Sequence, residues 1–272
     1  MTTGITETTG PHSSNIARDK ELHVQTTERV ASPVVDEVQL RQDLVSANHI
    51  LVRRGVLDAF GHVSARLAPG LDGFLLSRNL APGSVTAGDL LLHDLDGNVG
   101  DDRAPYLERF IHAEIYRARP DVMAVVHSHS PSVIPFGLSD VPLRPVVHMA
   151  GFLPTDATPV YEISDHGGDA TDLLITSSEL GASLARALGE GAVALMRGHG
   201  SIAVGTSVPE AVYRAVYTEV NAQIQLQAVS LGSYRSLSAG EARAADRKVG
   251  GQMHRAWNVW CSEVGTAGEG QR

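Results

Sequence analysis

The sequence predicts a single α/β domain, and three observations lead to this fold class. Segments with apolar residues at helical spacing alternate along the chain with short runs of strand character. The chain has 272 residues and is 43% hydrophobic, which is enough to bury a substantial core. No internal repeat or linker interrupts this pattern after residue 36. We therefore expect a disordered N-terminal arm at 1–35, one domain at 36–264 and a flexible tail at 265–272.

The predicted helices follow from apolar periodicity and from the residues that end each segment. Gly55 ends the first helix, and Arg119-Pro120 stops the second because a residue before proline disfavours helical geometry. Pro209 suits the first turn of a long helix. The expected helices are Val38–Leu51, Tyr106–Arg117, Leu173–Leu188, Pro209–Leu231 and a last helix that contains Trp257 and Trp260.

The predicted strands are short and bounded by turn residues. Val122–His127 and Ala192–Met196 are apolar, β-branched runs that indicate buried strands. The other expected strands are His62–Leu67, Gly73–Ser77, Asp89–Asp94 and Ser201–Val204. Six prolines between Pro131 and Ile163 exclude a long helix there. That region is expected to be loop with short regular pieces.

Composition and charge exclude several classes of protein. With 31 acidic and 22 basic residues the formal charge is −9, so a surface that neutralises nucleic-acid phosphates is not expected. No apolar stretch approaches the roughly 20 residues that span a membrane. A single cysteine excludes an internal disulfide framework and favours the cytoplasm. The unusual feature is the number of histidines, which is 12.

Three of these histidines occur in patterns that indicate a metal site. His127-Ser-His129 ends a buried strand, and residues two apart on a strand project to the same face, where one cation could contact both rings. In Gly198-His199-Gly200 the glycines permit a tight turn that presents one imidazole. Glu108, on the preceding helix, adds a carboxylate. Three imidazoles and a carboxylate are a typical set for a catalytic divalent ion with positions open for substrate.

With these motifs in place, the sequence resembles the class II aldolase/adducin family. The resemblance rests on P-Y-L-E-R-F-I-H at 105–112, on the strand ending V-V-H-S-H at 125–129 and on M-R-G-H-G at 196–200, and it spans about 38–240. It implies a three-layer α/β/α domain with a central, mainly antiparallel sheet. It also implies that His127, His129 and His199 are metal ligands, that Glu108 is the acid/base residue or a fourth ligand, and that the protein is a homotetramer.

Departures from the sugar-phosphate aldolases of this family indicate a different substrate. Where those enzymes have small hydroxyl residues that hold phosphate, this chain has Tyr106 and Leu107, and where they have an asparagine it has His62. These larger, flatter and more apolar residues suit an aromatic substrate. The chain most resembles the branch that decarboxylates hydroxylated aromatic acids, such as hydroxy-methylpyridine dicarboxylate and dihydroxyphthalate, and the related iron oxygenases of aminocoumarin biosynthesis.

The resulting hypothesis is a metal-dependent decarboxylase of a hydroxylated aromatic acid. One divalent ion, zinc, manganese or iron, would serve as the electron sink, and Glu108 would hold a raised pKa and return a proton to the ring. Arg78 and Arg197 are candidates for binding a substrate carboxylate, and Tyr106 and His62 are candidates for lining the pocket. No nucleic acid or membrane partner is expected.

Three alternatives remain open on the same scaffold. The first is a non-haem Fe(II) oxygenase that oxidatively decarboxylates an aryl 2-oxo acid such as prenylated 4-hydroxyphenylpyruvate. The second is an aldolase that acts on an unphosphorylated hydroxy-keto acid. The third is a non-catalytic, adducin-like scaffold, which the complete set of ligand residues argues against. The enzymes share ligands, so motifs alone do not separate them.

Overall fold

A seven-stranded sheet forms the centre of the protein in a computed structural model that describes residues 36–265. The strand order is β3-β2-β1-β4-β7-β6-β5, and all neighbours are antiparallel except β5 and β6. The strands are β1 His62–Arg66, β2 Phe74–Ser77, β3 Leu90–His93, β4 Ala124–Ser128, β5 Val160–Tyr161, β6 Val193–Met196 and β7 Gly200–Gly205. The arm predicted at 1–35, and the tail beyond residue 265, lie outside the described residues.

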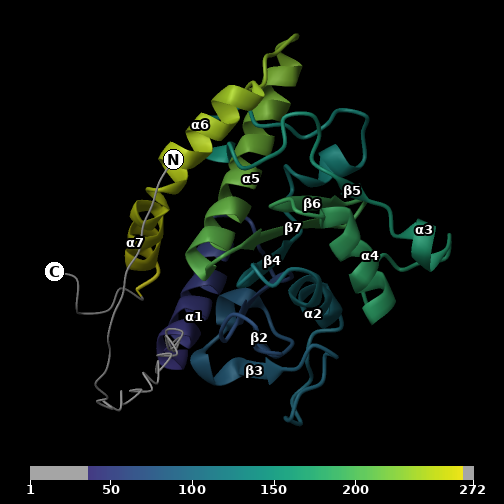
Figure 1. Cartoon of the computed structure of the whole chain (residues 1–272), viewed down its shortest axis with the longest axis vertical. Helices are drawn as coiled ribbons and strands as arrows, with labels where there is room; N and C mark the ends of the chain where they lie inside the picture. The colour runs from purple at the N-terminus through teal and green to yellow at the C-terminus, as the bar shows by residue number, and fades with distance from the viewer. Residues whose placement is uncertain (1–35, 266–272) are drawn as a thin grey trace, which may run out of the picture. The chain divides into compact units, whose positions relative to one another are not determined.

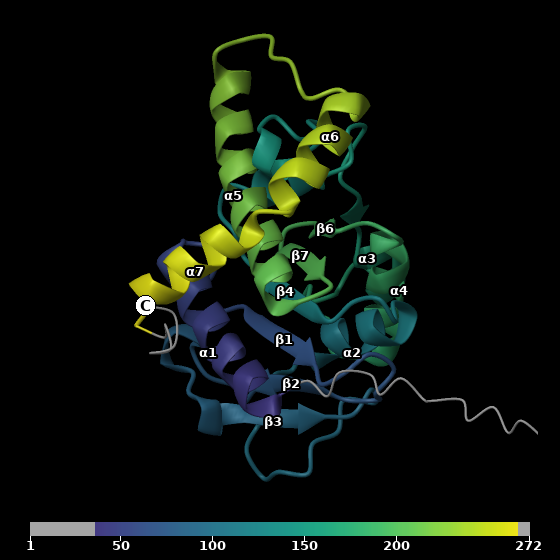
Figure 2. The ribbon, with the colours of Figure 1, turned by 60° about the vertical axis from the view of Figure 1, so that its left-hand side comes forward.

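Helices cover both faces of this sheet (Figures 1 and 2). One layer contains α1, α5 and α7, and the opposite layer contains α2 and α4. The helices are α1 Glu37–Arg53, α2 Arg109–Ala118, α3 Ser164–Gly167, α4 Ser178–Leu188, α5 Val208–Ser230, α6 Ala239–Gly250 and α7 Met253–Glu263. The predicted three-layer α/β/α fold with a mainly antiparallel sheet is confirmed.

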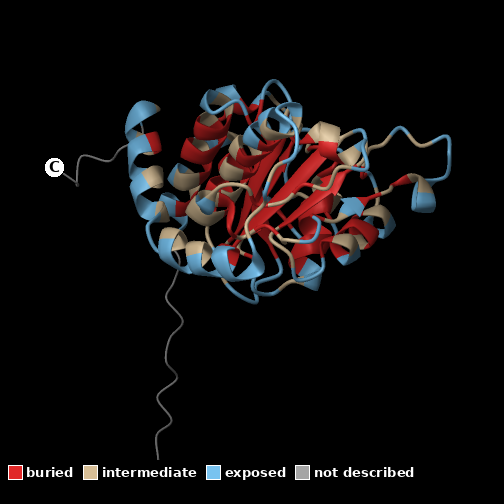
Figure 3. Cartoon of the chain, turned by 90° about the horizontal axis from the view of Figure 1, so that it is seen from above, coloured by how far each residue is buried: buried red, intermediate tan, exposed pale blue. Residues whose placement is uncertain are grey.

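Alternating side chains along each strand divide the core into two clusters. On β4, Ala124 and Val126 pack in the cluster under α1 and α5, whereas Val125 packs in the cluster under α2 and α4. Figure 3 shows these buried residues concentrated in the strands, with exposed residues on the outer helix faces. Because side chains alternate along a strand, His127 faces the same side as Val125, toward α2.

Helix boundaries differ from the sequence predictions at two places. The helix expected from Leu173 begins only at Ser178, because Leu173 has a positive φ of 70° and the Ser177 side chain caps the helix by accepting from the Leu180 N–H. The helix expected from Tyr106 begins at Arg109. Towards the C-terminus the chain forms two helices, α6 and α7, where one was predicted.

No helix within residues 36–265 combines the length and the apolar character that a membrane crossing requires.

The close approach of the β6–β7 hairpin to β4 yields a stability prediction. A Cβ on Gly200 would overlap the carbonyl oxygen of Ser128, which is backbone and has little room to yield. We expect Gly200→Ala to lower the free energy of unfolding in urea by about 3 kcal/mol, near the upper range for overpacking. Gly240→Ala, at an exposed helical position where the nearest atom to a Cβ is Ser238 Oγ at 3.9 Å, should leave the free energy of unfolding unchanged or raise it. Equal midpoints for the two variants would contradict the packing described here.

Candidate metal centre

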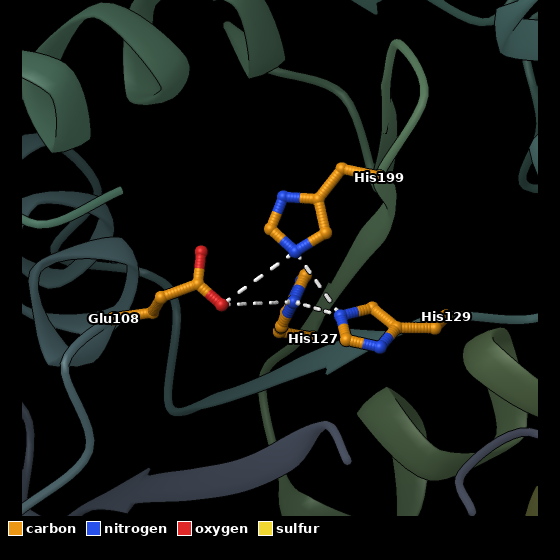
Figure 4. Close-up of side chains that lie close together, drawn as sticks. All are labelled: Glu108, His127, His129 and His199. Atoms are coloured by element: carbon orange, nitrogen blue, oxygen red, sulfur yellow. Dashed lines mark hydrogen bonds and ion pairs between the residues drawn. The ribbon is translucent and has the colours of Figure 1, made fainter. Parts of the chain in front are cut away.

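Four side chains from three parts of the chain converge at the end of β4 (Figure 4). They are Glu108, His127, His129 and His199, and each offers one ligand atom within 4.8 Å of the others. His127 lies on β4, His129 follows that strand, and His199 lies in the turn between β6 and β7. The structure therefore brings together all four residues that the sequence singled out as ligands or acid/base.

The strand pairing explains why the histidines meet. β4 and β7 are antiparallel neighbours, with His127 opposite Ile202 and Ser128 opposite Ser201. The hairpin before β7 therefore returns to the end of β4. There Gly198 has a positive φ of 68°, which glycine adopts readily, and this turn presents His199 to the other two rings.

The ring nitrogens have the spacing of ligands to one ion. The Nε2 atoms of His127 and His199 each lie 3.1 Å from Nε2 of His129. Nitrogens bonded at about 2.1 Å to one ion lie about 3.0 to 3.4 Å apart for octahedral to tetrahedral angles. Within the described chain, this donor set fits a divalent metal ion.

The tautomer of His127 also suits a ligand. Its Nδ1–H donates to the carbonyl oxygen of Ser201 at 3.2 Å, so the lone pair of Nε2 faces the other ligands. Burial lowers the pKa of His127 to about 3, and burial also lowers the pKa of His129. Neutral imidazole is the form that binds metal.

Glu108 is held with one oxygen toward the histidines. Its Oε1 accepts from the backbone N–H of Ile175 at 3.0 Å, and its Oε2 lies 3.6 Å from Nε2 of both His127 and His199. The Ile175 N–H is available because the chain around Leu173 is not helical. The contact between Ile175 and Glu108 could not be expected from the sequence, because the apolar spacing there predicted a helix.

The expectation of a raised pKa for Glu108 is wrong. Burial by itself raises this pKa, but the interactions of the carboxylate with His199 and His127 outweigh burial, so the pKa lies well below its usual range. Leu107, which was expected to shield the carboxylate, is itself 61% exposed. Glu108 is therefore ionised before any substrate binds.

A cavity of about 330 Å³ adjoins this group of ligands. Its lining is mostly apolar, with Tyr106 and His62 on one wall. The remaining lining residues are Ala59, Phe60, Gly61, Asn79, Leu80, Ala81, Leu107, Glu108, His129 and Leu174. Phe60, Asn79 and Leu174 were not expected from the sequence. Of these, Asn79 is next to the candidate Arg78 and Phe60 is two residues before the candidate His62, whereas Leu174 has no such neighbour.

The two candidate arginines lie elsewhere. Arg78 Nε donates to Asp89 at 2.7 Å, and Arg197 forms a two-point ion pair with Glu162. Neither lines the cavity, and within residues 36–265 no arginine or lysine lines it. Tyr106, in contrast, lines the cavity, and its hydroxyl donates to the carbonyl of Leu80.

Comparison with known proteins places this chain in a family. The model of the class II aldolase and adducin N-terminal domain matches residues 42–226. The chain belongs to the class II aldolase/adducin family. The resemblance seen in the sequence motifs is thereby confirmed.

Two curated relatives and one solved structure resemble this chain over most of their own length. The decarboxylase tropJ of Talaromyces stipitatus is 39% identical over 82% of this chain and 93% of its own length. A 3,4-dihydroxyphthalate decarboxylase of Arthrobacter keyseri is 32% identical over 71% of this chain and 79% of its own. Among solved structures, an aldolase II superfamily protein of Pseudomonas syringae has a TM-score of 0.71 at 23% identity, covering 88% of this chain and 96% of that one. That last similarity concerns the fold.

The convergence of the histidines predicts interdependent metal binding. We expect His129→Ala to lower the zinc content of purified, dialysed protein from about one ion per chain to near zero, because its Nε2 is the neighbour shared by the other two rings. The matched control is His254→Ala, an exposed histidine on α7, which should keep its zinc. Elemental analysis by mass spectrometry measures both. Zinc retained by His129→Ala would show that the ion binds elsewhere.

Proposed function

We propose that the protein is a divalent-metal-dependent decarboxylase of a hydroxylated aromatic carboxylic acid. The observation that carries the proposal is the position of the three Nε2 atoms and the Glu108 carboxylate beside an apolar cavity. Two relatives that align over most of their own length are named decarboxylases, and one of them acts on dihydroxyphthalate. The proposed catalytic domain is 36–264.

His127, His129 and His199 would hold the ion, which we propose to be zinc, manganese or iron. When bound, the ion supplies a Lewis acid that accepts negative charge from the substrate as CO₂ leaves. The cavity volume of about 330 Å³ suits a single aromatic ring with its substituents. Apolar walls from Phe60, Leu80 and Leu174 would contact the ring faces and exclude water.

Glu108 would move the proton. Glu108 is ionised in the free site, so its carboxylate is available to accept, as the first step, the proton of the hydroxyl group next to the substrate carboxylate. The bond between the ring and the carboxylate then breaks, CO₂ leaves, and the electron pair of that bond forms a C–H bond with the proton that Glu108 returns. Charge and atoms balance, and Glu108 ends ionised as it began.

The absence of arginine and lysine from the described cavity lining bears on how an acid would bind. Arg78 and Arg197, each paired with a carboxylate of this chain, are not part of the proposed substrate site. The charge of the substrate would be met by the ion and by neutral donors such as Asn79. Tyr106 would contact the ring, since its hydroxyl is already bonded to the protein.

Two finer points belong to the same proposal. The family resemblance favours a homotetramer, and the single cysteine favours a cytoplasmic enzyme. Nucleic acid is not a proposed partner, since the chain carries a formal charge of −9.

Parallel assays of CO₂ and O₂ test the reaction type. Protein reconstituted with Mn²⁺, Zn²⁺ or Fe²⁺ under anaerobic conditions is incubated with 3,4-dihydroxyphthalate, other ortho-hydroxy aromatic acids and aryl pyruvates. We expect CO₂ release from an ortho-hydroxy acid without O₂ uptake, because the electron pair of the broken bond is kept in the new C–H bond. Turnover that requires both Fe²⁺ and O₂, on an aryl pyruvate alone, would establish the oxygenase instead.

A further inference from the structure

A chain of buried polar side chains leads from the cavity into the core beneath α2. His62 Nδ1 lies 2.6 Å from His112 Nε2, and His112 Nδ1 lies 2.6 Å from Ser64 Oγ. Ser64 Oγ in turn lies 2.8 Å from the hydroxyl of Tyr116. All four residues are at most 3% exposed. Only His62 lines the cavity, so the chain has one end at the proposed substrate site.

The spacing of these residues follows from the two elements that carry them. His62 and Ser64 are two apart on β1 and project from the same face of the strand. His112 and Tyr116 are four apart on α2 and lie on one face of the helix. The two pairs therefore interdigitate. Tyr116 is fixed further by Arg66, whose guanidinium donates to the Tyr116 carbonyl and lies 4.9 Å from its ring centroid.

Each buried O–H or N–H hydrogen needs an acceptor. This requirement sets which residue donates and which accepts along this series of hydrogen bonds. Among residues 36–265, Ser64 Oγ is the only group that forms a hydrogen bond with the Tyr116 hydroxyl, so it is the only group that can accept the hydrogen of that hydroxyl. Tyr116 therefore donates to Ser64, and Ser64 donates to His112 Nδ1. His112 then carries its hydrogen on Nε2 and donates to His62 Nδ1. A reversed chain would bury an unsatisfied tyrosine hydroxyl hydrogen, which is costly.

At the cavity, this series of hydrogen bonds consequently ends in a donor, the His62 ring. His62 accepts at Nδ1, so its own hydrogen is on Nε2, the ring nitrogen left for a ligand in the cavity. A doubly protonated ring would also present a hydrogen at Nε2. The ring is held in place by contact with Tyr106, at 4.5 Å between centroids, and with His127, at 5.0 Å.

We propose that His62 is a catalytic hydrogen-bond donor to an anionic oxygen of the substrate, and that His112, Ser64 and Tyr116 are positioning residues that fix its tautomer. This inference rests on the proposed function, since it names the group that assists the ion at the same site. Among the described residues, no arginine or lysine lines the cavity to bind an acid. A fixed N–H there stabilises the charge that collects on the substrate oxygen as CO₂ leaves.

The tautomer is measured without substrate or turnover. Zinc-loaded protein with ¹⁵N-labelled histidine is sedimented, and solid-state NMR records which ring nitrogens carry hydrogen. The signals of His62 are assigned by their loss in His62→Gln. We expect the Nε2–H tautomer for both His62 and His112. A His62 ring with its hydrogen on Nδ1 and a bare Nε2 would overturn the proposal.

Tyr116→Phe separates positioning from mere packing. It removes the hydroxyl that starts the chain, and we expect kcat to fall about tenfold with KM changed less than twofold. The matched control is Tyr161→Phe, because the Tyr161 hydroxyl lies 2.7 Å from Ser183 in the same hydrophobic cluster but has no connection to His62. The control should lose similar thermal stability and keep its kcat. Equal kcat values for the two variants would refute a positioning role.

Substitutions of His62 itself test the donor. His62→Leu should lower kcat about 100-fold, the loss typical of one such donor. His62→Gln places an amide N–H near the position of Nε2 and should recover about tenfold of that loss. A kcat for His62→Leu within twofold of wild type would show that His62 does not act on the substrate. If the wild-type protein releases no CO₂ at all, the proposed function fails, whereas the tautomer experiment still decides the hydrogen-bond direction.

Discussion

The pairing of β4 with β7 is the constraint on which the rest of the site depends. It brings the end of one strand, with His127 and His129, against the hairpin that carries His199. The backbones approach so closely at Ser128 that only glycine is accommodated at position 200. Three imidazole nitrogens, two of which lie 3.1 Å from the third, form an arrangement that a cation stabilises.

Glu108 shows how this constraint determines the chemistry. Burial alone favours the protonated acid, yet the histidines that share the site reverse the effect, so the group is a carboxylate. The backbone N–H of Ile175 supports the same ionised form by donating to Oε1. An ionised carboxylate can accept a proton first and return it later, whereas the raised pKa expected from the sequence would leave the group protonated before substrate binds. The neighbouring histidines thus set the protonation state in which Glu108 begins.

Much of the fold and the four convergent side chains could be predicted from local pattern. Two motifs can each be recognised from a few neighbouring residues. They are the spacing of His127 and His129 on a buried strand and the glycines on either side of His199. The partners of the other polar side chains could not be predicted, because these side chains contact residues that are distant in the sequence. Arg78 and Arg197 looked available for a substrate, but Asp89 and Glu162, 11 and 35 residues away, already pair with them.

The same reason applies to the helix boundary at Leu173 and to the hydrogen bonds of His62. Leu173–Leu188 has helical periodicity throughout, but the first residues take another backbone path that supplies an N–H to Glu108. His62 and His112 are 50 residues apart, and only the packing of α2 on β1 shows that they share a hydrogen bond.

Anomalous diffraction from crystals of zinc-loaded protein, recorded on both sides of the zinc absorption edge, tests the central claim most directly. We expect one peak per chain, about 2.1 Å from Nε2 of His127, His129 and His199 and close to Oε2 of Glu108. A peak at any other position, or no peak within this group of residues, would contradict the metal centre and the reaction proposed for it.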